Sequence, residues 1–174
     1  MKCQKVQSNK RTDQYGESFH NRIRFLLETF AAVREVWPSR LPLLARLSVT
    51  DWAEGGVTLD ESIELIRQLK AAGLDMIDVS HGMVTPGETI PWSPGMMIGP
   101  AGRIRREVNI ATTTSWFITN PRQAEDALQA GHLDAVMLAR EMLRDPYWPY
   151  HAAKELGDKA ISSILPVQYA RAVE

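Results

Sequence analysis

Residues 58–80 read TLDESIELIRQLKAAGLDMIDVS and contain a capped amphipathic helix followed directly by a short apolar stretch. Thr58 and Glu61 have the spacing of a capping box, and Gly73 supplies a stop signal at the other end of the helix. Between these signals, apolar residues recur at helical spacing on one face: Ile63, Ile66 and Leu69. Residues 75–80 then have the composition of a strand that is covered on both faces. The segment therefore predicts one helix–strand unit of an α/β protein.

The same alternation extends on both sides of this unit. Upstream, apolar spacing predicts a helix over 19–36 with Ser18 as its N-cap, and a strand within 41–48. Downstream, the sequence predicts a strand over 109–114 and a helix that starts at Asn120-Pro121 and ends at Gly131. A further strand over 134–139 and a last helix over 146–156 follow. Strand and helix alternate four times, which predicts a parallel sheet with right-handed crossovers.

Length and composition limit the architecture and the partners. Four βα units form an open sheet or half of a (β/α)₈ barrel, and 174 residues are too few for a whole barrel of about 250 residues. We expect one partial domain over 1–174, with a loop at 1–17, βα units at 18–157 and a tail at 158–174. The formal net charge of -1 disfavours nucleic acid and anionic membranes as partners.

The sequence also bears on the compartment. It has no apolar run long enough to span a membrane and no apolar stretch of a signal peptide at its start. The single cysteine, Cys3, excludes an intrachain disulfide and a cysteine-based metal cage. A soluble, cytoplasmic protein is the expectation that fits these features.

Several side chains near the predicted strand ends could bind a ligand. Arg46 lies inside an apolar strand and must meet a carboxylate, carbonyl groups or a ligand. Arg140 follows the last strand and could clamp a phosphate, although a solvated arginine is equally compatible with its position. Trp92 and Trp116 could line a pocket or simply pack, and His81 fits a surface or hydrogen-bonded histidine better than a catalytic one.

Other features carry less functional information. The connection over 81–100 is too long for a turn, and loops of this length are usually functional or mobile. The basic run at Arg103, Arg105 and Arg106 is typical of a solvated helix face, and we assign it no partner. Dinucleotide, P-loop, zincin and α/β-hydrolase motifs are all missing from the sequence.

Residues 8–25 read SNKRTDQYGESFHNRIRF and closely resemble the S-N-x-R-x-D-x-Y-G-G-S-x-x-N-R-x-R-F signature of the Old Yellow Enzyme family. The resemblance continues through LARLS at 44–48, LDMIDVS at 74–80 and LAREMLRDP at 138–146. The segment PVQYAR at 166–171 is similar to the tail of the bacterial xenobiotic and ene reductases. This resemblance implies the carboxyl-terminal half of an FMN-bearing TIM barrel that takes hydride from NADH or NADPH and reduces an activated C=C bond in a small-molecule substrate.

The resemblance also implies roles for individual residues. Arg46 matches the family arginine beside the flavin N1 and C2 carbonyl, where a fixed cation stabilises charge on the reduced ring. Two loops match those that hold the FMN phosphate, namely Ser115-Trp116-Phe117 and Ala139-Arg140. Arg171 matches an arginine that reaches a neighbouring subunit's active site in part of the family, which implies a homo-oligomer.

Departures from the family pattern affect both the phosphate loops and the catalytic groups. Side chains replace usual glycines at Ala139, at Glu17 and within Trp116-Phe117, and they work against close backbone approach to a phosphate. The family's histidine pair and tyrosine proton donor precede the signature, where this chain has MKCQKVQ, so no catalytic residue is assigned. The alternative to a truncated enzyme is a non-catalytic half-barrel or flavin-binding remnant that needs a separate amino-terminal half.

Overall fold

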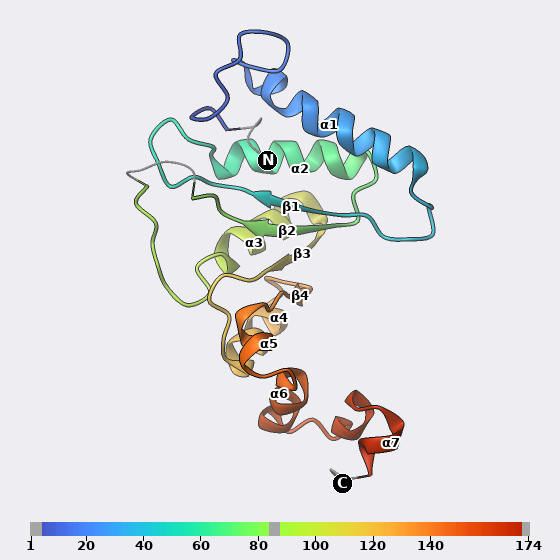
Figure 1. Cartoon of the computed structure of the whole chain (residues 1–174). Helices are drawn as coiled ribbons and strands as arrows, with labels where there is room; N and C mark the ends of the chain where they lie inside the picture. The colour runs from blue at the N-terminus through green and yellow to red at the C-terminus, as the bar shows by residue number, and fades with distance from the viewer. Residues whose placement is uncertain (1–4, 84–87, 172–174) are drawn as a thin grey trace.

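The computed structural model describes residues 5–83 and 88–171. Its strands form one parallel sheet in the order β1-β2-β3-β4 (Figure 1), with bounds Leu44–Ser48, Met76–Ser80, Ala111–Thr114 and Ala135–Val136. Each strand pairs with the next along the chain, as expected when every crossover is one helical connection. The predicted α/β class with four parallel βα units is confirmed.

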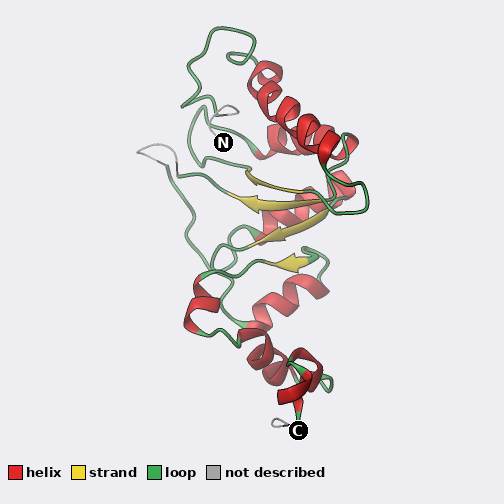
Figure 2. Cartoon of the chain, turned by 45° about the vertical axis from the view of Figure 1, so that its right-hand side comes forward, coloured by secondary structure: helices red, strands yellow, loops and turns green. Residues whose placement is uncertain are grey.

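Helices alternate with the strands throughout the described residues. In chain order they are α1 Phe19–Val36, α2 Leu59–Ala71, α3 Ile98–Ile104, α4 Pro121–Gln129, α5 Arg140–Arg144, α6 Trp148–Leu156 and α7 Val167–Ala170. A π-helical turn at Arg105–Asn109 extends α3, and a 3₁₀ turn at Ile161–Ile164 precedes α7. Figure 2 shows that the loops after the strands gather on one side of the sheet.

Local signals in the sequence explain the best-predicted helices. The Thr58 side chain accepts a hydrogen bond from the Glu61 backbone N–H, and the Glu61 side chain accepts one from the Thr58 N–H, which completes the capping box of α2. Gly73 has φ +99°, a conformation that a residue with a Cβ adopts at a cost. Ser18 and Asn120 cap α1 and α4, so the predicted starts of these helices are confirmed.

All four strands are shorter than the sequence predicts, the one predicted over 75–80 by one residue and the other three by two or more. The segment predicted over 41–48 enters the sheet only at Leu44, because Pro42 has no N–H to donate and the Asp75 carboxylate takes the Leu43 N–H at 2.7 Å. The segment predicted over 109–114 starts at Ala111, because Asn109 ends the π-helical turn with φ +54°. The segment predicted over 134–139 keeps only Ala135–Val136, which pair with β3 alone.

The helical predictions after residue 100 also need correction. The last long helix starts at Trp148 rather than at residue 146, and the sequence reading missed α5. The basic run is not merely solvated, because Arg103 pairs with Asp60 and Glu107, and Arg105 pairs with Asp134 at 2.9 Å. These pairs connect α3 and its π-helical turn to the neighbouring units.

The signature at residues 8–25 builds the loop that leads into α1. Arg22 is buried, donates to the Glu17 carbonyl at 2.9 Å and pairs with Glu61 of the capping box at 2.6 Å. Asn9 donates to the Tyr15 carbonyl at 2.7 Å. The signature therefore joins the first loop to α1 and α2.

The two faces of the sheet differ in burial. Leu47 and Ile77 are buried on the face that packs against the helices, and they belong to one continuous apolar core. Side chains that alternate with them lie on the opposite face, where Leu44 is 49% exposed and Met137, just after β4, is 37% exposed. The structure thus has one packed face and one open face.

Truncating a central core side chain should destabilise the chain strongly. Ile66 of α2 is fully buried, so Ile66→Ala leaves a cavity and should lower the free energy of unfolding by about 2–5 kcal/mol. Urea denaturation of this variant and of Ile164→Ala, at an exposed position, measures the difference. Equal effects of the two substitutions would contradict the assignment of the core.

Candidate functional site

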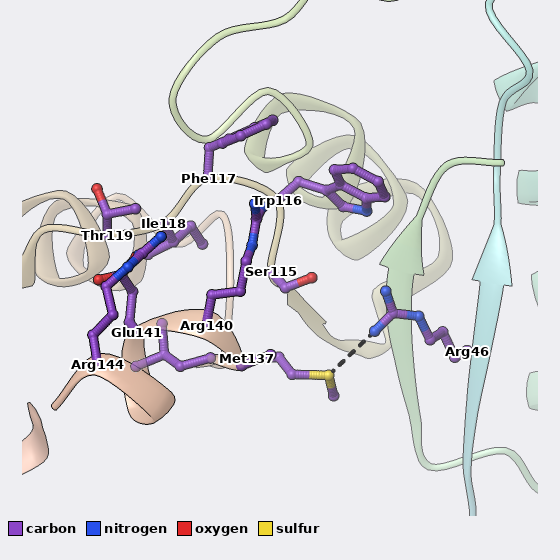
Figure 3. A pocket seen from close by; sticks show the side chains of 12 residues that line it. Arg46, Ser115, Trp116, Phe117, Ile118, Thr119, Met137, Arg140, Glu141 and Arg144 are labelled. Atoms are coloured by element: carbon purple, nitrogen blue, oxygen red, sulfur yellow. Dashed lines mark hydrogen bonds and ion pairs between the residues drawn. The ribbon is translucent and has the colours of Figure 1, made fainter. Parts of the chain in front are cut away.

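One cleft brings together all six residues for which the sequence resemblance implies cofactor contacts. Its volume is about 310 Å³, and Figure 3 shows side chains from β1, the β3–α4 loop and the β4–α5 region around it. The six predicted residues are Arg46, Ser115, Trp116, Phe117, Ala139 and Arg140. The cleft has further walls that the sequence reading did not name: Ile118, Thr119, Met137, Leu138, Glu141 and Arg144. Three segments far apart in sequence therefore contribute to one concave site.

Arg46 is held from the neighbouring strand. The parallel register places it beside Asp78, and its Nη1 donates to Asp78 Oδ2 at 2.8 Å. Its Nη2 donates to Ser80 Oγ at 3.3 Å, and Met137 Sδ lies 3.4 Å from Nη1 (Figure 3). The Arg46 side chain is half-exposed while that of Asp78 is 4% exposed. Both readings of Arg46 thus apply, because it forms an ion pair and also lines the cleft.

Asp78 is a buried acid that the sequence reading missed. Burial raises the pKa of its carboxyl above the usual value, and the Arg46 guanidinium opposes this rise. Its Oδ1 atom is buried without a hydrogen-bond partner in the described part of the chain. An apolar strand with an acid beside the arginine of the preceding strand is a signal that could have revealed the pair.

Trp116 forms an ordered wall of the cleft. Its Nε1 donates to Ser80 Oγ at 3.0 Å, so one hydroxyl contacts both Trp116 and Arg46. The indole packs against the tilted His81 ring at a centroid separation of 3.9 Å and lies 6.1 Å from the Trp92 ring. Trp116 therefore lines the site and also belongs to an aromatic cluster outside it.

A left-handed backbone occurs at Glu17 and within Trp116-Phe117, where the family pattern usually has glycine. Phe117 has φ +57° and Glu17 has φ +64°, although each carries a Cβ. Residues other than glycine adopt this region at a cost of roughly 1–2 kcal/mol, so surrounding contacts must maintain it. At Phe117 the substitution therefore adds a ring to the cleft while the backbone stays in the region that glycine favours.

Arg140 supplies a cation to the cleft without a carboxylate partner. It forms no ion pair within the residues that the structure describes, and its guanidinium lies 5.6 Å from the Phe117 ring centroid. Arg144, by contrast, pairs with Glu141 on the same short helix. Arg140 is consequently available to an anion in the cleft.

His81 and the amino-terminal segment differ from expectation. His81 is 4% exposed, so the surface alternative is wrong, while the hydrogen-bonded alternative is met only by a long contact of 3.4 Å between Nδ1 and the Gly82 carbonyl. Lys5 is buried against the fully buried Asp51, a pair for which the sequence had no local signal. Residues 1–4, which include Cys3, lie outside the described residues, and Lys5, Val6 and Gln7 include no histidine or tyrosine.

The remaining predictions concern Arg171 and two absences. Arg171 follows α7, is exposed and is not among the residues that line the cleft. Over residues 5–83 and 88–171, no cluster of three His, Cys, Asp or Glu side chains could hold a metal ion. Within the same ranges, no helix has the length and apolarity needed to cross a membrane.

The arrangement is that of part of a parallel α/β barrel with a cationic and aromatic cleft. A model of the NADH:flavin oxidoreductase / NADH oxidase family matches residues 4–159, and the chain belongs to this family. An NADPH dehydrogenase from Geobacillus sp. (strain WCH70) is 48% identical over 164 residues, which cover 94% of this chain and 46% of that protein. One from Geobacillus thermodenitrificans (strain NG80-2) is 46% identical with the same coverage.

Solved structures show the same fold. A 2-naphthoyl-CoA reductase in complex with 2-naphthoyl-CoA matches with a TM-score of 0.79 and 30% identity, over 87% of this chain and 24% of that one. A histamine dehydrogenase from Rhizobium sp. 4-9 matches with a TM-score of 0.69 at 22% identity, over 91% of this chain and 23% of that one. The chain spans about half the length of the curated relatives it matches. The expectation of a partial barrel of the Old Yellow Enzyme type is confirmed.

Removing the Arg46 guanidinium should destabilise the chain more at neutral than at acidic pH. In Arg46→Ala the buried Asp78 carboxylate loses its cation, so its folded-state pKa rises further above the unfolded value. Stability is then lost as the pH rises through that folded-state pKa. Leaving the buried acceptor unsatisfied should cost about 2 kcal/mol near pH 7.5 and less near pH 4.5.

Urea denaturation of Arg46→Ala and wild type at both pH values measures this difference, and Arg40→Ala at an exposed position is the control. A cost of Arg46→Ala that is independent of pH would show that Asp78 is not the partner that matters.

Proposed function

We propose that the cleft binds FMN and that the chain is the cofactor-binding half of an NAD(P)H-dependent oxidoreductase. The observation that carries this proposal is the convergence of Arg46 with two separate loops on one cleft that contains the unpaired cation of Arg140. Family membership and the NADPH dehydrogenase relatives support the same assignment. FMN, when bound, supplies hydride transfer from NADH or NADPH to an acceptor such as an activated C=C bond.

The residues present fit the chemistry of this cofactor. Arg140 and the polar Ser115 would hold the phosphate, because a charge-assisted hydrogen bond from arginine suits phosphate oxygens. Phe117, in the stretch where the family pattern has a glycine, has a left-handed backbone of the kind that glycine favours. Ala139 lines the same cleft at the start of α5.

Arg46 would serve the flavin ring. Its guanidinium is fixed by Asp78 and Ser80, so its positive charge does not need to reorient when negative charge accumulates nearby. A preorganised cation of this kind stabilises developing charge more effectively than a mobile one. The Arg46–Asp78 pair therefore fits a site for a redox cofactor.

A complementary half is the partner that the structure favours. The open face of the sheet exposes Leu44 and Met137, and the outer edges of β1 and β4 have no neighbouring strand in the described residues. The relatives are about twice as long as this chain. We infer that an amino-terminal half covers this face and supplies the groups that bind and protonate the substrate.

A second candidate function is a non-catalytic, FMN-binding half-barrel. It is favoured by the segment that precedes the signature, where Lys5 is engaged in a buried ion pair and Val6 and Gln7 cannot act as proton donors. Association of copies of the chain, with Arg171 reaching a neighbour, is the other possible assembly. Both candidates place FMN in the same cleft.

Arg140→Ala should weaken FMN binding. Loss of one charged hydrogen bond to phosphate costs about 1.5–3 kcal/mol, which corresponds to roughly a tenfold to hundredfold rise in Kd. Quenching of flavin fluorescence during titration measures the affinity. Arg40→Ala, an exposed arginine away from the cleft, should leave it unchanged. An unchanged Kd in Arg140→Ala would remove Arg140 from the site.

Turnover should depend on the complementary half. We expect the isolated chain with excess FMN to show no NADPH-dependent reduction of 2-cyclohexenone above the free-flavin background. Co-expression with the amino-terminal half of the Geobacillus sp. relative should yield a copurifying complex and measurable activity. Robust activity of the isolated chain would contradict the proposed need for a second half. A flavin-loaded but inactive complex would favour the non-catalytic alternative.

A further inference from the structure

His81 lies directly behind a wall of the cleft. It follows β2, is 4% exposed and does not itself line the cleft. Its ring is tilted by 41° against the Trp116 indole, with the ring centroids 3.9 Å apart. Trp92 contacts His81 edge-on at 5.6 Å. The imidazole therefore contacts both the Trp116 indole, which lines the cleft, and the Trp92 ring.

The polar atoms of His81 are poorly satisfied. Nδ1 lies 3.4 Å from the Gly82 carbonyl, and Nε2 is buried with no hydrogen-bond partner among the described residues. Burial lowers the pKa of His81 below its ordinary value of 6.5, so the imidazole is neutral near pH 7. This environment accommodates the neutral ring and leaves an imidazolium without an acceptor for its Nε2–H among the described residues.

The charged groups around His81 do not provide that acceptor. Lys5 disfavours a second cation nearby, and the Asp51 carboxylate is already taken by Lys5 and by the Val57 N–H at 3.0 Å. Glu88 favours protonation, but its effect is smaller than that of burial. Protonation of His81 therefore places a charge where neither carboxylate pairs with it.

Trp116 connects His81 to the cation of the cleft. The indole is held by the His81 ring and by its hydrogen bond to Ser80 Oγ. The same Ser80 hydroxyl accepts a hydrogen bond from Arg46. Displacement of the indole would thus change a cleft wall and one contact of Arg46.

We propose that His81 is a positioning residue of the cleft, whose neutral ring holds the Trp116 indole in place and whose protonation releases it. The proposal rests on the proposed function only in taking the cleft as a cofactor site. The imidazolium, which has no acceptor among the described residues, moves away from the indole. The indole then keeps its hydrogen bond to Ser80 Oγ but loses its contact with the His81 ring. Acidification therefore loosens the Trp116 wall of the cleft.

Circular dichroism of the isolated chain tests this proposal. The Trp92 and Trp116 rings, with centroids 6.1 Å apart and planes at 44°, should give an exciton couplet in the indole absorption region. We expect the couplet near pH 7.5 and its loss in acid, below the lowered pKa of His81, in a titration followed down to the lowest pH at which the helical signal persists. Trp116→Phe and Trp92→Phe should each abolish the couplet at both pH values, which assigns it to this pair.

Variants of His81 separate positioning from simple packing. His81→Ala should lose the couplet at both pH values, whereas His81→Phe, a flat ring that cannot be protonated, should keep it at both. A wild-type couplet that persists down to the lowest pH at which the helical signal survives would overturn the proposal, as would an acid-induced loss that is equally large in His81→Phe. Retention of the couplet in His81→Ala near pH 7.5 would also overturn it.

FMN titration of the same samples distinguishes this proposal from the proposed function. If the wild-type chain shows the pH-dependent couplet and binds no FMN, the FMN assignment fails while the positioning role of His81 is supported. If the wild-type chain binds FMN but His81→Ala retains the couplet, the FMN assignment is supported and the positioning role of His81 fails.

Discussion

The buried carboxylate of Asp78 fixes the Arg46 guanidinium, and the rest of the cleft is arranged around that cation. The pair depends on the parallel register of β1 and β2, which places the two residues side by side on the open face of the sheet. Ser80, two residues further along β2, extends the same row and joins Arg46 to Trp116. A register shift of one residue would turn these side chains toward the apolar core.

Parallel topology explains why distant segments meet at this cation. The loops after β3 and β4 emerge at the same edge of the sheet. Ser115–Phe117 and Ala139–Arg140 therefore approach each other although they are separated in the sequence. The helices contribute stability on the other face, where one core spans all the units. The division between a packed face and an open face therefore separates the scaffold from the site.

Sequence signals predicted the elements whose ends depend on local chemistry. The capping box at Thr58, the αL glycine at Gly73 and the cap at Asn120 all act within a few residues, and the corresponding helix ends were correct. Strand ends depend on partners elsewhere, such as the Asp75 carboxylate that takes the Leu43 N–H.

The residues of the candidate site also divide into those that the sequence predicted and those that it did not. Arg46 and Arg140 were assigned to the site from sequence, whereas Asp78 and Ser80, although they lie in the similar stretch 74–80, acquire their contacts only when β1 pairs with β2 and Trp116 packs against Ser80. The buried Lys5–Asp51 pair joins residues 46 positions apart and likewise had no local pattern.

Glu17 and Phe117 show that residues other than glycine can have a left-handed backbone. Phe117 keeps φ +57° with its ring between Arg140 and Trp92, at an edge-on separation of 5.7 Å from the latter. Such contacts can offset a local cost of roughly 1–2 kcal/mol, so the left-handed turn is imposed by the surrounding fold. The Trp116 and Phe117 rings line the cleft, so they are among the groups that a ligand there would contact. The departure from the family pattern within Trp116-Phe117 therefore bears on the contacts that the cleft offers to a ligand.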